Sequence, residues 1–370
     1  EILESEPDTE TPKEESVAVR TIYLSTDPYM RCRFNEDTGV PYTKSFEIGK
    51  PITSAGIGVV MESNNNFGLN QGDLLMSEFD AWPWQEEFML DQRNLKNLHK
   101  LSKSMAAVCP VTYSLGCVGL TGVSAYFGIL GEVNPTVNDV VVISGAAGAV
   151  GSVAGQLALK RGATVVGICG SDEKCAYLVN KLGFYRAVNY KSKTFQEDFV
   201  RAVGEQGASI YFDNVGGSIS DLVIENMRHS SHIVLCGQIS MYNTEIPYPP
   251  PLPAHSQALV EKKCINRARY LVFNYENRFP EATEYLLKQV ASGDLQGTET
   301  TSVGIENAPK AFVDMMQGGN IGKQIVKVSK SPTLGVLDAI RAYTPSVVRR
   351  FIAERTIIKH PCCFCLFLMI

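Results

Sequence analysis

The sequence of 370 residues has no surplus of positive charge, and this restricts the partners that the protein can bind. Its 39 acidic side chains outnumber its 34 basic ones, which gives a formal net charge of −5 at pH 7. Proteins that bind nucleic acids usually present a basic patch that neutralises phosphates. We therefore expect no nucleic-acid partner.

A convincing membrane span is also lacking. Residues 140–159 carry no charge, but three glycines lie within seven residues directly after a β-branched run. Such glycines would break a spanning helix in its first third. The apolar run after Pro361 has nine residues and is too short to cross a bilayer. Lipid attached to Cys362, Cys363 or Cys365 is one interpretation of this tail; we favour a chain end without a fold of its own.

No secretory segment precedes the ten cysteines, which are scattered along the chain. Most lie inside apolar, strand-like stretches such as Ile168-Cys169 and Leu235-Cys236. Outside an oxidising compartment such thiols stay reduced and pack as small apolar side chains. We expect a cytoplasmic protein with buried, reduced cysteines. Because the chain begins with Glu1 and a strand is in progress from Val17, we also expect that its first residues are missing.

Residues 140–168 carry the clearest structural signal. A β-branched run at 140–143 leads into a glycine turn, a helix-like run to about residue 162 and a second apolar strand at 165–168. This order is typical of a dinucleotide site, because the turn lets a pyrophosphate approach the N-terminus of the helix. The spacing is Gly145-x-x-Gly148-x-x-Gly151 instead of the commoner G-x-G-x-x-G. An α/β unit whose glycines serve only close packing therefore remains an alternative.

Changes of pattern divide the chain into four parts. Residues 1–110 show short strands with glycine and proline between them, which indicates a β-rich domain. Residues 111–278 alternate helix and strand, which predicts a doubly wound parallel sheet. Residues 279–329 should return to the β-rich domain, and residues 330–370 should lie outside the fold. The strands predicted for the doubly wound sheet are 140–144, 164–169, 187–189, 209–212, 232–236 and 270–273.

A dinucleotide domain joined to a β-rich domain is the plan of zinc alcohol dehydrogenases, but zinc ligands are scarce. The sequence has five histidines, and no His-Glu pair precedes the strand at Gly56-Ile57-Gly58. The cysteines do not show the spacing of a structural zinc site. We expect no metal, so that hydroxyls, amides or the cofactor must polarise the substrate.

The choice of cofactor depends on a position about 20 residues beyond the glycines, where an acid would bind the ribose hydroxyls of NAD. Gly170-Ser171 occupies that position. These residues leave room for a 2′-phosphate, which Lys174 and Tyr190 could hold. Because Asp172 and Glu173 follow directly, spacing alone leaves the choice between NAD and NADP open.

Five segments carry a resemblance that covers nearly all of residues 17–328. They are Val19 to Arg31, Tyr211 to Gly217, Leu235 to Asn243, Pro247 to Pro251 and Gly318 to Lys323. On these segments the sequence resembles the zinc-independent medium-chain dehydrogenases/reductases, nearest to those that reduce 15-oxoprostaglandins. The resemblance implies an α/β fold in which a Rossmann sheet binds NADPH and is joined to a β-rich GroES-like domain.

The resemblance also implies roles for individual residues. Those that would contact the substrate are Tyr42, Phe79 and Tyr242. Those that would bind NADPH are Gly148, Ala149, Val150, Gly151, Lys174, Tyr190, Asn214, Cys236, Gly237, Gln238, Ile239, Ser240, Met241, Tyr242, Tyr270, Leu271, Val272 and Asn320.

The implied reaction is NADPH-dependent reduction of the carbon-carbon double bond of α,β-unsaturated ketones, such as 15-oxoprostaglandins. Hydride transfer to the β-carbon builds negative charge on the ketone oxygen, and a positioned hydrogen-bond donor lowers that barrier. We predict that Tyr242 is this catalytic donor, and packing on the nicotinamide is the alternative role of its ring.

Two further hypotheses remain open: a quinone or general alkenal reductase on the same fold, and a catalytically silent NADPH-binding protein. For a reductase, the expected partner is a small enone or a molecule derived from a fatty acid. We expect the chain to act as a monomer or a homodimer.

Overall fold

The structure is a computed structural model that describes residues 16–64, 68–90, 98–244 and 250–359. Its contacts divide the chain into two compact units. Unit 1 contains the residues up to Leu120, Leu287–Asp294 and the residues from Glu299 onward, and unit 2 contains Thr121–Leu286 and Leu295–Thr298. The chain passes from unit 1 to unit 2 after residue 120, whereas the sequence predicted a boundary after residue 110. It returns to unit 1 after residue 286, whereas the predicted boundary followed residue 278.

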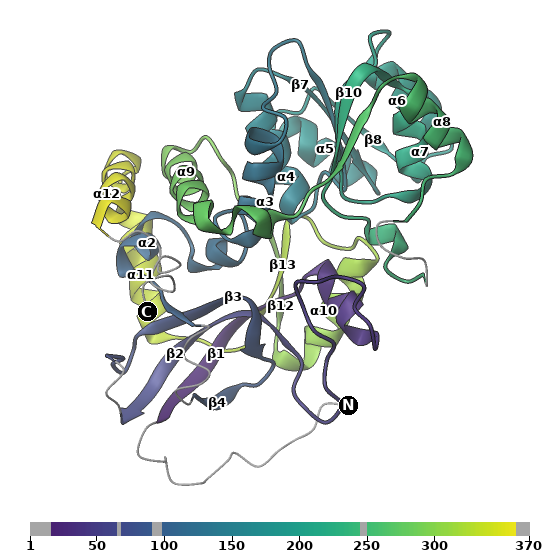
Figure 1. Cartoon of the computed structure of the whole chain (residues 1–370). Helices are drawn as coiled ribbons and strands as arrows, with labels where there is room; N and C mark the ends of the chain where they lie inside the picture. The colour runs from purple at the N-terminus through teal and green to yellow at the C-terminus, as the bar shows by residue number, and fades with distance from the viewer. Residues whose placement is uncertain (1–15, 65–67, 91–97, 245–249, 360–370) are drawn as a thin grey trace. The chain divides into compact units, whose positions relative to one another are not determined.

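Unit 1 is built on a mainly antiparallel sheet (Figure 1). The strand order is β12-β13-β1-β2-β3-β5, and β4 pairs with β1. The strands are β1 Ser16–Ser25, β2 Thr53–Asn64, β3 Leu74–Pro83, β4 Glu87–Leu90, β5 His99–Lys100, β12 Glu299–Val303 and β13 Lys323–Lys327. Because β13 pairs antiparallel with β1, the late part of the chain lies within the sheet that the early part begins.

Each face of this sheet carries an apolar cluster, because successive residues of a strand point to opposite sides. Val59 lies in one cluster with Ile22 and Ile57, and its neighbour Val60 lies in the other with Trp82. The helical elements of unit 1 are η1 Pro28–Phe34, α2 Lys103–Val108, η2 Val111–Leu115, η6 Ile305–Asn307, α10 Ala308–Met316, α11 Pro332–Tyr343 and α12 Ser346–Lys359.

The residues after Ser329 correct the expectation that this part of the chain lies outside the fold. Both α11 and α12 pack against α2. Leu334 and Leu337 of α11 are buried in the apolar cluster around Ile57. The sequence pattern concealed this packing, because α11 and α12 also expose large apolar side chains. Residues 360–370, which include the tail cysteines, lie outside the described residues.

Unit 2 is built on a parallel sheet with the order β11-β10-β9-β6-β7-β8. The strands are β6 Val140–Ser144, β7 Thr164–Cys169, β8 Arg186–Asn189, β9 Ala208–Asp213, β10 Met227–Leu235 and β11 Asn266–Arg269. The first strand, β6, lies in the middle, and the order runs outward from it in both directions. This confirms the predicted doubly wound Rossmann sheet.

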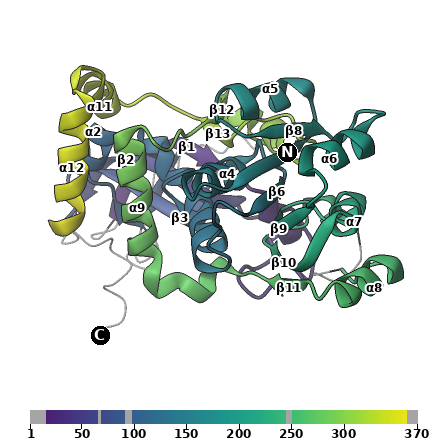
Figure 2. The same cartoon turned by 90° about the horizontal axis from the view of Figure 1, so that it is seen from above.

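Helices cover both faces of the unit 2 sheet (Figure 2). Phe199 of α6 and Val223 of α7 are buried against Val166 and Ile168 of β7. On the other face, a Cβ at Gly167 would lie 2.8 Å from Leu178 of α5. The helical elements that lie wholly or mostly in unit 2 are α3 Leu120–Tyr126, η3 Phe127–Gly131, α4 Ala149–Lys160, α5 Asp172–Asn180, α6 Phe195–Val203, α7 Gly217–Glu225, η4 Ile239–Met241, α8 Ala254–Lys262 and η5 Val272–Arg278. Helix α9 Phe279–Ser292 begins in unit 2 and ends in unit 1.

The last strand of this sheet precedes the segment predicted for it at 270–273, so that prediction was wrong. The strand is Asn266–Arg269, and Val272 already begins η5. Tyr270 is buried for another reason: its hydroxyl donates a hydrogen bond to the backbone oxygen of Ser124 at 2.9 Å. The strand itself lies at the edge of the sheet, and its polar side chains gave no apolar signal.

No helix in the part of the chain that the structure describes is long and apolar enough to cross a membrane.

Candidate active site

The turn after β6 reverses the chain at the carboxyl edge of the unit 2 sheet. Gly145 has φ +59°, a left-handed conformation that favours glycine. Gly148 is the N-cap of α4 and has no side chain to cover the first N–H groups of the helix, which begins with Ala149 and Val150. A Cβ at Gly151 would lie 2.5 Å from the Gly145 carbonyl oxygen, so the helix approaches the turn this closely only with glycine. The arrangement suits a phosphate at the N-terminus of α4.

The buried carboxylate of Asp213, at the end of β9, ties the neighbouring loop to this turn. Asp213 Oδ1 accepts hydrogen bonds from Ser144 Oγ at 3.1 Å and from the Gly216 N–H at 2.9 Å. Asn214 donates its backbone N–H to Ser144 Oγ at 2.9 Å and its side-chain amide to the Ser144 carbonyl at 2.7 Å. Asn214 therefore lies where β6 and β9 end side by side, which is where doubly wound sheets bind ligands.

Sequence reasoning named Asn214 but missed Ser144 and Asp213. The available signal was an acid that directly follows the apolar strand residues Tyr211 and Phe212, since a buried carboxylate must be hydrogen-bonded. Asp213 is 2 % exposed, and it also accepts hydrogen bonds from the hydroxyls of Tyr211 and Ser220, at 2.8 and 2.7 Å. Its role is to position the loops at this edge.

The segment from Cys236 to Tyr242 follows β10 and folds over the same edge. The backbone N–H groups of Cys236 and Gly237 both donate to the Asp213 carbonyl at 2.9 Å, and that of Ser240 donates to Val215 at 3.1 Å. Ile239, Ser240 and Met241 form the short helix η4. A Cβ at Gly237 would lie 3.4 Å from the Tyr242 hydroxyl, so this hydroxyl lies beside the strand end.

The buried side chain of Gln238 indicates whether these residues fit a dinucleotide. Its side chain is 2 % exposed, and its Oε1 has no hydrogen-bond partner among the described residues. A buried amide oxygen without a partner is costly, so such an atom indicates a ligand that donates to it. The carboxamide and the ribose hydroxyls of a nicotinamide nucleotide carry such donors. Together with the glycine turn before α4, which suits a phosphate, Gln238 makes unit 2 fit this cofactor.

The segment after β7 contains the residues predicted to choose between cofactors. Ser171 is the N-cap of α5, and its Oγ accepts from the Lys174 backbone N–H at 3.2 Å. Burial lowers the pKa of Lys174, because the charged form loses hydration. Asp172 is one of the two acids that left the choice between NAD and NADP open. It accepts a hydrogen bond from the Asn189 side chain at 2.8 Å.

Tyr190 completes this corner, together with a cation that sequence reasoning missed. A Cβ at Gly170 would lie 2.9 Å from the Tyr190 ring, so the ring packs directly on the glycine. Lys191 Nζ lies 5.8 Å from the centroid of the same ring, and its charge contributes to the lowered pKa of Lys174. A second lysine directly after Tyr190 was the sequence signal for this pair of cations.

Four more residues were predicted to bind NADPH: Tyr270, Leu271, Val272 and Asn320. The side chain of Tyr270 is used inside unit 2, as described above, and Leu271 and Val272 follow it at the start of η5. Asn320 belongs to unit 1 and donates its side-chain amide to the Gly322 carbonyl at 2.7 Å. The proline run at 247–251 falls mainly on residues 245–249, which are outside the described residues.

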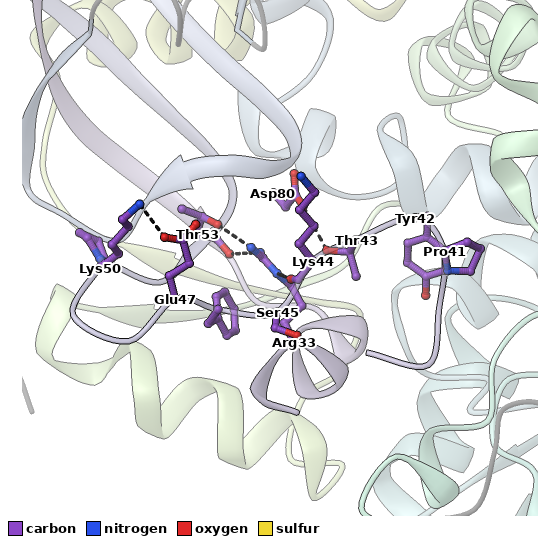
Figure 3. A pocket seen from close by; sticks show the side chains of 12 residues that line it. Arg33, Pro41, Tyr42, Thr43, Lys44, Ser45, Glu47, Lys50, Thr53 and Asp80 are labelled. Carbon is purple, nitrogen blue, oxygen red and sulfur yellow. Dashed lines mark hydrogen bonds and ion pairs between the residues drawn. The ribbon is translucent and has the colours of Figure 1, made fainter. Parts of the chain in front are cut away.

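Unit 1 brings the two aromatic residues predicted to bind substrate close together. The rings of Tyr42 and Phe79 have centroids 6.1 Å apart, and Tyr29 stacks on Phe79 at 4.5 Å. Tyr42 also lines a pocket of about 430 Å³ in the same unit (Figure 3). Arg33 connects two segments of the pocket lining, because it donates hydrogen bonds to the Lys44 and Thr53 carbonyl oxygens at 2.9 and 2.8 Å. Tyr242, the third predicted substrate contact, belongs to unit 2.

Within the described ranges, no group of three or more His, Cys, Asp or Glu side chains could hold a metal ion.

Comparison with known proteins gives matches over most of the chain. Residues 149–288 match the family model described as zinc-binding dehydrogenase, and residues 3–98 match the N-terminal domain of oxidoreductase. The chain is 36% identical to the NADP⁺-dependent 2-alkenal reductase of Nicotiana tabacum over 85% of its length and 88% of that protein. It is 34% identical to prostaglandin reductase 1 of Bos taurus, over 85% and 90%.

A solved structure agrees with these matches. The crystal structure of CurA from Vibrio vulnificus in complex with NADPH superimposes with a TM-score of 0.77 at 30% identity. The superposition covers 88% of this chain and 94% of that one.

Proposed function

The chain belongs to the medium-chain dehydrogenase/reductase family, and from this premise we propose that it is an NADPH-dependent reductase of α,β-unsaturated carbonyl compounds. Two relatives support the reaction class, because they are a 2-alkenal reductase and a prostaglandin reductase. The CurA complex supports the cofactor, because it contains NADPH and is similar over most of the chain. The observation that carries the proposal is the convergence of the α4 turn, Gln238 and Tyr242 at one edge of unit 2.

In this proposal, different residues of unit 2 bind different parts of NADPH. The N–H groups at the start of α4 hold the pyrophosphate, and Gln238 Oε1 accepts a hydrogen bond from the nicotinamide half. Lys174 and Tyr190, with Lys191 beside them, hold the 2′-phosphate. When bound, NADPH supplies the hydride that the double bond accepts.

Tyr242 serves the chemistry through its hydroxyl. As the β-carbon gains a hydride, electrons move onto the carbonyl oxygen, and a fixed O–H donor stabilises the negative charge there. The Tyr242 hydroxyl lies beside Gly237, at the end of β10 and in the same segment as Gln238. The proton that finally reaches the α-carbon comes from this hydroxyl or from solvent.

15-Oxoprostaglandins are the substrates that we assign within this class. The support is the resemblance of five sequence segments to reductases of these compounds, together with the match to prostaglandin reductase 1. Tyr42 and Phe79 would provide an aromatic wall for a long apolar substrate. A general alkenal reductase is the second candidate, and the match to the tobacco enzyme favours it.

The oxidation of NADPH in the presence of a panel of acceptors tests this proposal. The panel contains a 15-oxoprostaglandin, a simple enone, a short 2-alkenal and a quinone, and the loss of the reduced nicotinamide absorbance is followed for each. We expect the highest kcat/KM with the 15-oxoprostaglandin and a product saturated at the double bond. A kcat/KM for the short 2-alkenal equal to or above that for the 15-oxoprostaglandin would favour the second candidate. Binding of NADPH without turnover of any acceptor would contradict both.

A further inference from the structure

Two cysteines of unit 2 face each other within the segment that should select NADPH. Cys169 is the last residue of β7, and Cys175 lies in the first turn of α5. Their Sγ atoms are 3.3 Å apart. Cys169 is 4 % exposed and Cys175 is partly exposed, so only Cys175 is open to a reagent from solvent. The residues between them include Gly170, Ser171 and Lys174.

The environment gives the two thiols different reactivity. The hydrogen bond between the two sulfurs lowers the pKa of Cys175 and raises that of Cys169. A position in the first turn of a helix also favours a thiolate, because the positive end of the helix dipole lies there. Cys175 is therefore the nucleophile, and Cys169 is the thiol that can resolve its oxidised form.

The distance between the sulfurs permits a covalent bond after a small movement. A disulfide requires an S–S length of about 2.05 Å, and the sulfurs start at 3.3 Å. The two residues are six positions apart, so the bridge would close a short ring through the segment between them. Closing that ring would draw the first turn of α5 toward β7. The hydrogen bond from the Lys174 N–H to Ser171 Oγ lies within the ring.

We propose that Cys169 and Cys175 form a dithiol site that hydroperoxides oxidise to a disulfide, and that the disulfide weakens the binding of NADPH by displacing Lys174. The effect on the cofactor rests on the proposed function, since it assumes that Lys174 pairs with the 2′-phosphate.

The two steps balance in atoms and electrons. The Cys175 thiolate attacks the outer oxygen of the hydroperoxide, the O–O bond breaks, and the leaving alkoxide or hydroxide takes up the proton that the thiol had released, so that an alcohol or water departs. The product is the sulfenic acid of Cys175. The Cys169 sulfur then attacks the Cys175 sulfur, which expels water and forms the S–S bond. Two thiols lose two electrons in total, and one hydroperoxide is reduced.

Bound NADPH should protect the pair, because ligand binding and oxidation are linked. If the disulfide weakens NADPH, then NADPH must favour the reduced dithiol by the same factor. The protein would then lose its cofactor when hydroperoxides are abundant and NADPH is scarce.

The experiment treats the full chain with hydrogen peroxide, with and without NADPH, and maps the disulfide by mass spectrometry of peptides. The dissociation constants of NADPH and NADH are measured by fluorescence before oxidation, after it and after dithiothreitol. We expect a peptide linked through Cys169 and Cys175, an NADPH affinity about tenfold or more weaker, little change for NADH, and full reversal. Cys175→Ser should abolish the linked peptide and the loss of affinity.

Cys264→Ser is the matched control, because Cys264 is exposed and does not belong to the pair. This variant should respond to peroxide as the native chain does. The absence of the linked peptide, or a linked peptide with unchanged NADPH affinity, would overturn the proposal. No readout uses an enone, so a protein that forms the disulfide and releases NADPH but reduces no acceptor would contradict the proposed function alone.

Discussion

In the proposed binding mode, the preference for NADPH would depend on charges around a single phosphate, which would make it a property of individual residues. Ser171 occupies the position at which an acid would bind the ribose of NAD, and Asp172 is held by Asn189. Lys191 lies near the Tyr190 ring, and its positive charge acts on Lys174. A 2′-phosphate would relieve the repulsion between the two lysines, whereas a ribose hydroxyl would not.

Replacing Lys174 tests this preference. We expect Lys174→Ala to weaken NADPH by about tenfold or more, because a charge-assisted hydrogen bond to the phosphate is lost. NADH has no 2′-phosphate, so its affinity should change little. Lys191→Ala, at a more exposed position, should cost up to about fivefold. Titration of each variant with both cofactors measures the effect, and equal losses for NADPH and NADH would contradict the assignment.

Replacing Tyr242 separates its hydroxyl from its ring. Tyr242→Phe keeps the packing beside Gly237 and removes only the donor. We expect kcat and kcat/KM to fall together by about a hundredfold, because the lost bond stabilises charge that exists only in the transition state. The NADPH dissociation constant should stay within about twofold of the native value, as ring packing is retained. A variant with full kcat would show that Tyr242 acts by packing alone.

Among the elements, β6, α4 and β7 were the most predictable from sequence. Both strands have the predicted residue bounds, because β-branched runs and glycines leave little choice at 140–169. The edge strand Asn266–Arg269 was missed, since a strand with one neighbour and polar side chains lacks an apolar pattern. The pairing of Cys169 with Cys175 and the position of Gln238 depend on how loops return to the sheet edge. Local patterns do not record that geometry.

A glycine inside α4 provides a prediction at the scale of elements. A Cβ at Gly155 would lie 1.9 Å from the ring of Phe184, whose side chain is 2 % exposed. We expect Gly155→Ala to lower the free energy of unfolding by about 1–3 kcal/mol, because the ring has no space to move. Adding Phe184→Leu should recover part of the loss, which a double-mutant cycle would measure.

Gly335 supplies the matched control for this prediction. It lies in α11, and a Cβ there would meet nothing within 4 Å. Gly335→Ala should leave stability unchanged or raise it by up to about 1 kcal/mol, because alanine favours helix. Urea unfolding of both variants makes the comparison. If Gly155→Ala were as stable as Gly335→Ala, the close packing of α4 on Phe184 would be refuted.

At the scale of the whole molecule, the part of the chain after Ser329 is where sequence and structure differ most. The sequence pattern there shows apolar, basic and cysteine-rich stretches without a clear partner. The structure places α11 and α12 against α2, a helix distant in sequence, and single sequences do not reveal such pairings. Arg341 strengthens the contact, because it donates hydrogen bonds to the backbone oxygens of Ala106 and Cys109 at 3.4 and 3.3 Å.

Two neighbouring apolar residues of α11 test whether this packing stabilises unit 1. Leu337 is 8 % exposed and contributes to the apolar cluster around Ile57, whereas Val336 on the same helix is 61% exposed. We expect Leu337→Ala to cost about 2–5 kcal/mol, because it leaves a cavity in that cluster. Val336→Ala should change stability by less than about 0.5 kcal/mol. NADPH affinity should be unaffected in both variants, since none of the residues proposed to bind the cofactor in unit 2 packs in this cluster. Thermal unfolding with and without NADPH distinguishes the outcomes, and two variants of equal stability would mean that α11 does not belong to the core of unit 1.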